Sequence, residues 1–176
     1  MRYIYIMANN IGRPNEFNAT MQSQNDENIP GSAGLLDWLV SYQPDRKVVL
    51  LQTSGPIDKN SFSAMITAAV ATAERQNCVS ILGDHRNSSL NLDPLEIYYS
   101  PKVMIGSGLD SRYFIAMAFP QMTEDIQFME NVCRNSGLQL SVHPDIEAAH
   151  QWLTARSTSV ESPCQFATVS TEQGKQ

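Results

Sequence analysis

Long hydrophobic runs are missing from this sequence. Its apolar stretches are short and interrupted, far below the roughly 20 residues that a membrane-spanning helix needs. The segment from Met1 to Met7 also lacks the long apolar core of a signal peptide. We therefore expect a cytoplasmic protein that does not span a membrane.

Positive charge is scarce as well. The 176 residues include 12 Lys and Arg against 18 Asp and Glu, which gives a formal net charge of -6. No run of Lys or Arg is present that could follow a phosphate backbone. Nucleic acid is therefore not an expected partner.

Cysteine is rare and unpaired. Cys78, Cys133 and Cys164 are odd in number, widely spaced and without a Cys-x-x-Cys pair. This spacing argues against both a disulfide framework and a thiolate metal site. Two of the three lie among apolar residues, which indicates buried thiols.

Catalytic and cofactor-binding motifs are missing too. A hydrolase that used Ser88 or Ser89 with His143 or His150 would need a G-x-S-x-G elbow, and the sequence contains none. With His85, the histidines lie on three different predicted elements, without the i, i+4 spacing that places two metal ligands on one helix face. The glycines form neither a Walker loop nor a dinucleotide fingerprint. We expect no enzymatic activity, no metal and no cofactor, with an uncharacterised hydrolase as the weakest alternative.

Both ends of the chain have polar compositions. Residues 8–33 contain few large apolar side chains, so they cannot offset the entropy of ordering. Arg2 to Ile6 is rich in β-forming residues and could be a short added strand or an interaction handle. We predict a flexible arm over residues 1–33, one domain over residues 34–156 and a flexible tail over residues 157–176.

The central part of the chain alternates between strand and helix patterns. The predicted strands are 35–42, 47–53, 78–82, 113–119 and 138–142. The predicted helices begin after the capping residues Asp58, Asp93, Thr123 and Asp145. Residues 87–89 are expected to form a loop, and Pro101 is expected to kink the second helix or make it restart. The order β-β-α-β-α-β-α-β-α predicts an α/β domain with a mixed four- to five-stranded sheet and flanking helices.

Three short strings add a family resemblance. They are Thr53 to Ile57, Ile81 to Arg86 and Asp145 to Leu153. Their order and spacing resemble the SpoIIAA-like family of STAS-type domains, a group of small bacterial proteins, over about residues 35–155. The resemblance implies a mixed sheet flanked by helices, no cofactor and no established reaction.

The same resemblance implies two kinds of function. The sporulation member of the family antagonises an anti-sigma factor and is switched by phosphorylation of a serine in an Asp-Ser-Ser-Gly string at a helix start. Other members resemble CRAL-TRIO lipid carriers, with a crevice for a nonpolar ligand. Ser88 and Ser89 are the candidate phosphorylation sites here. They precede Leu90 to Leu92 rather than a glycine and a helix start, so the sequence departs from the sporulation pattern.

Charged residues at the end of a strand form one candidate binding site. Asp84 and Arg86 follow a buried strand, and open α/β sheets commonly place ligand contacts at such positions. In a functional interpretation, Arg86 meets an anion or a partner carboxylate while Asp84 orients it. In the alternative interpretation, the two residues form a local ion pair that holds the loop.

An apolar segment forms the other candidate site. Tyr98, Val103 and Met104 belong to a stretch that is more apolar than one helix face requires. It could cover a ligand crevice against Met65 and Ile66, or form an ordinary core helix or a homodimer face. The leading hypothesis is a non-enzymatic STAS-type module that binds a protein partner or a small apolar, lipid-like ligand. A serine-phosphorylatable anti-sigma-factor antagonist is the alternative.

Overall fold

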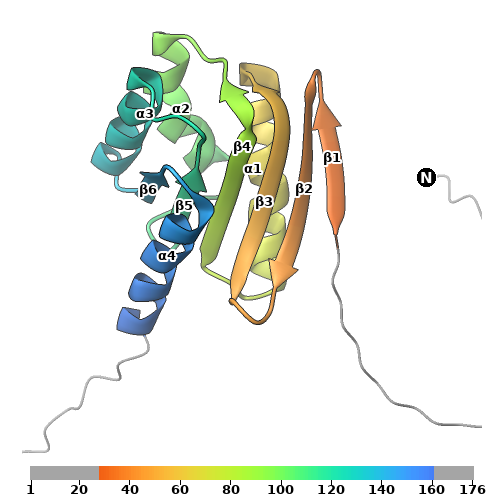
Figure 1. Cartoon of the computed structure of the whole chain (residues 1–176), viewed down its shortest axis with the longest axis vertical. Coiled ribbons are helices and arrows are strands. Elements are labelled where there is room, and N and C mark those ends of the chain that lie inside the picture. The colour runs from red at the N-terminus through yellow and green to blue at the C-terminus, as the bar shows by residue number, and fades with distance from the viewer. Residues whose placement is uncertain (1–27, 161–176) are drawn as a thin grey trace, which may run out of the picture.

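A computed structural model describes residues 28–160 of the chain, as a six-stranded sheet with four helices (Figure 1). The strands are β1 (Ile29–Ala33), β2 (Leu36–Gln43), β3 (Val48–Ile57), β4 (Ser80–Leu90), β5 (Phe114–Ala118) and β6 (Gln139–His143). The helices are α1 (Lys59–Arg75), α2 (Pro94–Gly106), α3 (Glu124–Asn135) and α4 (Ile146–Val160). None of these helices combines the length and the hydropathy that crossing a membrane requires.

Strands that follow one another in the chain are also neighbours in the sheet, in the order β1-β2-β3-β4-β5-β6. The first three strands pair antiparallel, and β3 to β6 pair parallel. A helix connects each parallel pair, because parallel neighbours need a long crossover connection. The predicted mixed α/β sheet is therefore confirmed, with six strands instead of four or five.

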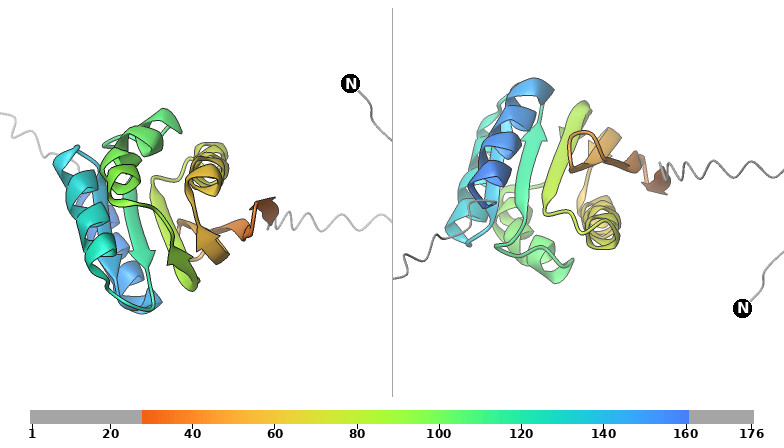
Figure 2. Two further views of the ribbon diagram at one scale, coloured as in Figure 1. Left: turned by 90° about the horizontal axis from the view of Figure 1, so that it is seen from above. Right: turned by 90° about the horizontal axis from the view of Figure 1, so that it is seen from below.

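The helices cover the two faces of the sheet unequally (Figure 2). The larger core lies between one face and helices α1, α2 and α3, whereas a smaller core lies under α4 on the other face. Helix α4 packs on β4, β5 and β6. The corresponding face of β1 to β3 is more open, and Asp37, Gln52 and Ser54 are exposed on it.

Each helix begins where the sequence predicts, because a side chain caps its first turn. At α2, the Asp93 carboxylate accepts a hydrogen bond from the Glu96 amide at 2.8 Å. The Glu96 carboxylate accepts one from the Asp93 amide at 3.1 Å, which completes a capping box. The four capping residues are Asp58, Asp93, Thr123 and Asp145.

Both ends of the domain extend beyond the predicted boundaries. Strand β1 pairs with β2, so Ile29–Ala33 belongs to the sheet and not to the predicted arm of residues 1–33. Pro30 and Gly31 gave this segment its loop-like composition, but Gly31 is required there because a Cβ atom would collide with the Trp38 indole. Helix α4 likewise takes in residues 157–160 of the predicted tail. The rest of the predicted arm and tail lies outside the described residues.

Two internal boundaries also differ from the predictions. Residues 87–89 are part of β4 and not a loop, because β3 continues to Ile57 and its last residues pair with Ser88 to Leu90. Helix α2 runs through Pro101 to Gly106 as one helix and does not restart. Pro101 is buried against the core, and this packing offsets the backbone hydrogen bond that a proline cannot donate.

Candidate functional site

The outer side of helix α2 carries most of the exposed large apolar side chains of the described residues. Of the eight such side chains, five lie on α2, with exposed fractions between 37% and 63%. The helical repeat places them on one side, together with the exposed Lys102, opposite the buried Ile97, Ser100 and Met104. We call this surface the α2 outer face, and its residues are Leu95, Tyr98, Tyr99, Lys102, Val103 and Ile105.

The predicted apolar crevice is only partly assembled. Met104 is 3% exposed and lines a small cavity under α1 and α2 together with Met65 and Ile66, as the crevice hypothesis required. Tyr98 and Val103 instead lie on the α2 outer face, with their side chains exposed. The cavity has a volume of about 30 Å³, which is room for about one water molecule. In this conformation it cannot hold an acyl chain.

His85, which lies between Asp84 and Arg86 at the end of the predicted strand, borders the same cavity. Its ring is almost fully buried and lies 4.9 Å, centroid to centroid, from the ring of Phe119. A Cβ atom on Gly83 would come within 2.5 Å of His85 Nε2, so the glycine makes room for the imidazole. Burial lowers the pKa of His85 to about 4, although the negative charge of Asp84 acts in the opposite direction.

A chain of hydrogen bonds connects this buried histidine to one of the candidate serines. Thr53 Oγ1 lies 2.8 Å from His85 Nδ1 and 2.7 Å from Ser88 Oγ. Thr53 is buried and Ser88 is half-buried, whereas Ser89 is exposed. Ser88 is therefore coupled to the core through Thr53, and the two candidate serines have different environments.

Asp84 and Arg86 form a local ion pair on the other side of β4. Arg86 Nε donates to Asp84 Oδ1 at 2.8 Å, and Arg86 Nη2 donates to Asp84 Oδ2 at 2.9 Å. These hydrogen bonds from Arg86 are the main reason that the pKa of Asp84 is lowered. This geometry is that of the local ion pair, the alternative interpretation of these two residues. The Arg86 side chain is still 49% exposed, so it could also reach a ligand.

The buried role of His85 has a signal in the sequence. Alternate residues of a strand point to the same face, and Ile81, Gly83 and His85 share a face in this way. The alternation places His85 on the face of Ile81, which packs in the larger core, and Asp84 and Arg86 on the face of Leu82, which packs in the smaller core under α4. The partner Thr53 is far from His85 in sequence, so its contact could not be predicted from spacing.

The remaining reactive residues are dispersed. Cys78 and Cys133 are buried, as predicted for two of the thiols, and burial raises the pKa of Cys133 to about 11. Cys164 lies outside the described residues. His143 ends β6 and His150 lies on α4. Across residues 28–160, the structure brings together no group of three His, Cys, Asp or Glu side chains that could hold a metal ion.

The sequence matches no model of a known protein family and no curated protein. Among solved structures, the chain is similar to an uncharacterised protein of the DUF3478 family with a SpoIIAA-like fold, from Shewanella loihica PV-4. The identity is 15%, over 70% of this chain and 98% of that one, with a TM-score of 0.45. It is also similar to the anti-sigma factor antagonist SpoIIAA in its unphosphorylated form, with 16% identity over 65% of this chain and 96% of that one and a TM-score of 0.38. The SpoIIAA-like fold predicted from the sequence strings is the fold of both structures.

Proposed function

We propose that this chain is a non-enzymatic protein-interaction module that binds a partner protein through the α2 outer face. The observation that carries the proposal is the concentration of five exposed large apolar side chains on one helix. Contiguous exposed apolar surface that is rimmed by polar residues is typical of interaction sites. Tyrosine is also enriched at protein interfaces, and Tyr98 and Tyr99 stand edge to face on this surface, 5.3 Å apart between ring centroids.

A protein partner suits these features better than a small apolar ligand. Sites for small molecules commonly enclose about 300–1,000 Å³, whereas the cavity under α2 has about 30 Å³. The apolar side chains that could bind a partner are outside this cavity and exposed. A lipid-like ligand would first have to displace Met65, Met104 or their neighbours.

The α2 outer face also limits the chemistry of the partner. Lys102 lies among its apolar side chains, and an ammonium group that becomes buried in an interface needs a partner for its charge. We therefore expect the partner to offer an apolar surface with a carboxylate opposite Lys102.

Photo-crosslinking in cells of the native host tests the proposal. A photoreactive phenylalanine analogue would replace Tyr99, and as a control it would replace Leu35, which is 81% exposed but lies in the turn between β1 and β2. We expect one discrete crosslinked product from position 99 that position 35 does not give. The substitution Lys102→Glu should remove this product because it reverses the charge that faces the partner.

Other outcomes would contradict the proposal. A product of twice the chain mass from position 99 would identify the face as a homodimer contact. Identical products from positions 99 and 35, or the absence of any product that depends on Lys102, would remove the assigned interaction face.

The hydrogen bond between Ser88 and the buried Thr53 favours a second candidate function, a phosphorylation switch. A phosphate would add about -1.5 to -2 charge units to an oxygen that now lies 2.7 Å from the buried Thr53 hydroxyl. The modification would therefore act on the core and not only on the surface. Intact-mass and peptide mass spectrometry of protein from its native host would test this candidate. Phosphate on Ser88 would support it, and phosphate on neither serine would count against it.

A further inference from the structure

The small cavity under α1 and α2 brings three methionines and one histidine together. They come from four different elements: Met65 from α1, His85 from β4, Met104 from α2 and Met117 from β5. All four are buried. Among the described residues that line the cavity, His85 alone has a polar side chain. A buried imidazole therefore shares one cavity with several thioethers.

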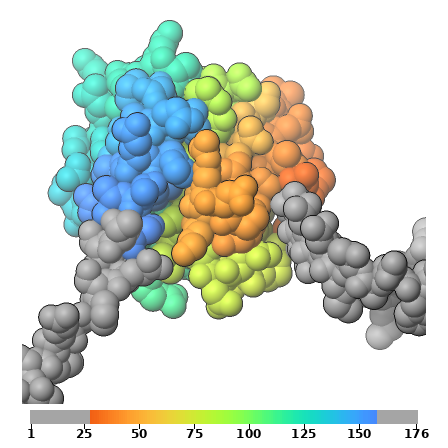
Figure 3. Space-filling view, turned by 60° about the horizontal axis from the view of Figure 1, so that its bottom comes forward, coloured from red at the N-terminus to blue at the C-terminus, as the bar shows by residue number. Residues whose placement is uncertain are grey.

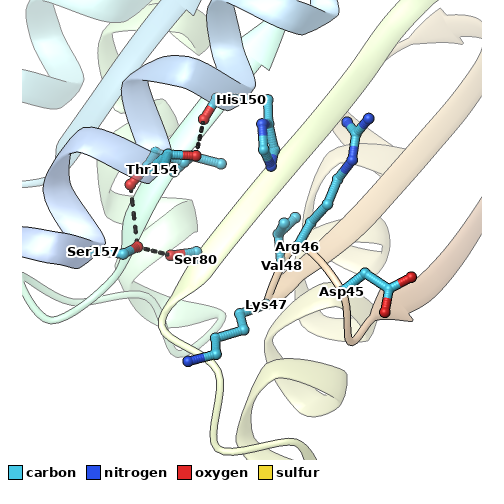
Figure 4. Close-up of a pocket in the computed structure, with 9 residues that line it drawn as sticks. Asp45, Arg46, Lys47, Val48, Ser80, His150, Thr154 and Ser157 are labelled. Atoms are coloured by element: carbon cyan, nitrogen blue, oxygen red, sulfur yellow. Dashed lines mark hydrogen bonds between the residues drawn. The ribbon is translucent and has the colours of Figure 1, made fainter.

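This cavity differs from the larger hollow between the β2–β3 turn and α4, which lies at the end of the molecule that Figure 3 shows. In that hollow, polar side chains have partners within the protein (Figure 4). Arg46 pairs with Glu147 at 3.8 Å, and Ser80 and Ser157 share a hydrogen bond at 3.1 Å. Asp45 adds a negative charge to the same lining. Its described lining residues therefore show no surplus of charge that would select a ligand.

The sheet places the imidazole beside one of the methionines. Gly83 and Met117 are partners across β4 and β5 and point to the same face. A Cβ atom on Gly83 would come within 2.5 Å of His85 Nε2, so the ring lies over the glycine. Neighbouring strands are only about 4.8 Å apart. Nε2 of His85 therefore lies close to the base of the Met117 side chain.

The other ring nitrogen is held by the hydrogen-bond chain. Nδ1 lies 2.8 Å from Thr53 Oγ1, which lies 2.7 Å from Ser88 Oγ. When Nδ1 carries the ring proton and donates to Thr53, the threonine can donate its own proton to Ser88. Nε2 of His85 then has a free lone pair. Histidines that bind metals are commonly oriented by such a hydrogen bond from the second nitrogen.

The methionines supply soft, uncharged donors. A thioether sulfur is polarizable, and methionine has three rotatable bonds, so the sulfur atoms of Met65 and Met117 can turn toward the imidazole. The Met104 sulfur already accepts a contact from the Cys133 thiol at 3.5 Å, and we assign it no ligand role. Thioether donors select soft ions such as Cu(I), whereas carboxylates and water suit hard cations.

The size and charge of the surroundings suit a single monovalent cation. The cavity of about 30 Å³ has room for about one water molecule, so an ion would enter it without a hydration shell. The negative charge of Asp84 favours positive charge at His85. A divalent ion would be costly to bury here, because these ligands carry no negative charge to offset its own. The site is thus distinct from clusters of His, Cys, Asp or Glu, which the described residues do not form.

We propose that His85, Met65 and Met117 bind one Cu(I) ion in this cavity. The ion is coordinated by Nε2 of His85 and by the Sδ atoms of the two methionines. It enters and leaves as Cu(I), so no electron transfer is involved. The site lies on the inner side of α2 and does not depend on the protein interaction proposed for the α2 outer face.

Titration of the full chain with silver(I) tests this site. Silver(I) has the charge and the softness of Cu(I) but is not oxidised by air. The titrated chain carries Cys164→Ser, so that this thiol does not compete for the metal. Cys78 and Cys133 are buried, and burial raises the pKa of both thiols. They therefore stay protonated, whereas the thiolate is the form that binds metals.

Methyl-labelled methionines and 15N-labelled histidines report where the silver binds. We expect shifts at the methyl groups of Met65 and Met117 that saturate at one equivalent, together with a shift of His85 Nε2. Zinc(II) should cause none of these shifts. Silver shifts that are confined to other methionines, an unmoved His85 Nε2, or equal shifts with zinc(II) would overturn the proposal, whether or not any ligand variant folds.

Matched methionine variants complete the test. Met65→Leu and Met117→Leu nearly preserve the apolar volume, and each should weaken silver binding at least about tenfold. Met129→Leu is the control, because Met129 is buried in the same core but does not line the cavity. It should leave the affinity unchanged. An unchanged affinity in Met65→Leu or Met117→Leu, or an equal loss in Met129→Leu, would also overturn the assignment.

Discussion

The two sides of strand β4 near Asp84 carry different polar groups: a neutral histidine on one side and an ion pair on the other. Toward the core, His85 is held neutral, packed on Phe119 and bonded to Thr53. On the other side, Asp84 and Arg86 neutralise each other in a two-bond ion pair that reaches solvent through Arg86. Residues that are adjacent in sequence therefore differ in what they contribute: the inward residue stabilises the core, and the outward pair remains available for contacts.

Substitution of His85, on the core-facing side of β4, should cause the largest loss of stability. His85→Ala removes a buried ring and leaves Thr53 without its ring-nitrogen partner. We expect the free energy of unfolding to fall by about 3 to 4 kcal/mol, within the range for large-to-small core substitutions. Chemical denaturation at pH 7.5 measures the change.

Gly83 provides the control for this prediction. Gly83→Ala alone should destabilise the fold, because the new Cβ atom would lie 2.5 Å from His85 Nε2. In the His85→Ala background the same substitution should cost much less, since the imidazole is gone. Additive effects of the two substitutions would contradict the contact.

Lowering the pH should have the next largest effect on the free energy of unfolding, through His85. In the unfolded chain the histidine has a pKa near 6.5, whereas in the folded protein the pKa of His85 is lowered to about 4. Between these values the unfolded state binds a proton that the folded state does not, so stability is full above about pH 6.5 and falls as the pH decreases toward 4. The total loss is on the order of 3 kcal/mol, of which about 2 should appear between pH 7 and pH 5.

The variant His85→Gln isolates this contribution. It should remove most of the decrease between pH 7 and pH 5, leaving the smaller share of His143, whose pKa is also lowered by burial. The lowered pKa of Asp84 acts at lower pH, because its unfolded value is 3.8. An unchanged slope in His85→Gln would show that His85 is not the group that titrates.

Substitutions of the ion pair on the other side of β4 should destabilise the fold less. Asp84→Ala removes the acceptor of two hydrogen bonds from the Arg86 guanidinium and one from the Arg86 amide, but the arginine side chain can turn to water because it is half exposed. We expect a loss of about 1 to 2 kcal/mol in the free energy of unfolding, typical of hydrogen bonds to a charged group. Arg86→Ala is the matched test: it should cost more than an ordinary surface substitution, since it leaves the mostly buried Asp84 carboxylate without its cation.

The sequence predicted those features that depend on neighbouring residues. The helix caps and the parallel α/β core follow from local spacing, and both are confirmed. Features that depend on distant partners were missed. β1 pairs with β2 at a place where the Trp38 ring needs a glycine opposite it, and the end of β4 forms because the end of β3 pairs with it. Neither requirement is visible in the composition of the segment itself.

The candidate site shows the same division. The apolar excess of α2 is visible in the sequence, and the crevice hypothesis places Tyr98, Val103 and Met104 in one lining, with a core helix or a homodimer face as the alternatives. The structure separates Met104, in the core, from Tyr98 and Val103, on the surface. Helical spacing could have made this separation, because Met104 lies on the same side as Ile97 and Ser100. The link from His85 through Thr53 to Ser88 needed the register between β3 and β4.

The smallest predicted effect compares the two serines at the end of β4. Ser88→Glu places a carboxylate where a half-buried hydroxyl now bonds to Thr53, so we expect a loss of about 1 kcal/mol in the free energy of unfolding, the usual cost of a lost hydrogen bond. Ser89→Glu changes an exposed position and should stay within about 0.5 kcal/mol of the unsubstituted protein. Thermal melts of both variants measure the difference, and Thr53→Val should make Ser88→Glu less costly because the inward partner is gone. Equal effects at the two positions would mean that Ser88 is not coupled to the buried histidine, and the phosphorylation switch would then lose the observation that favours it.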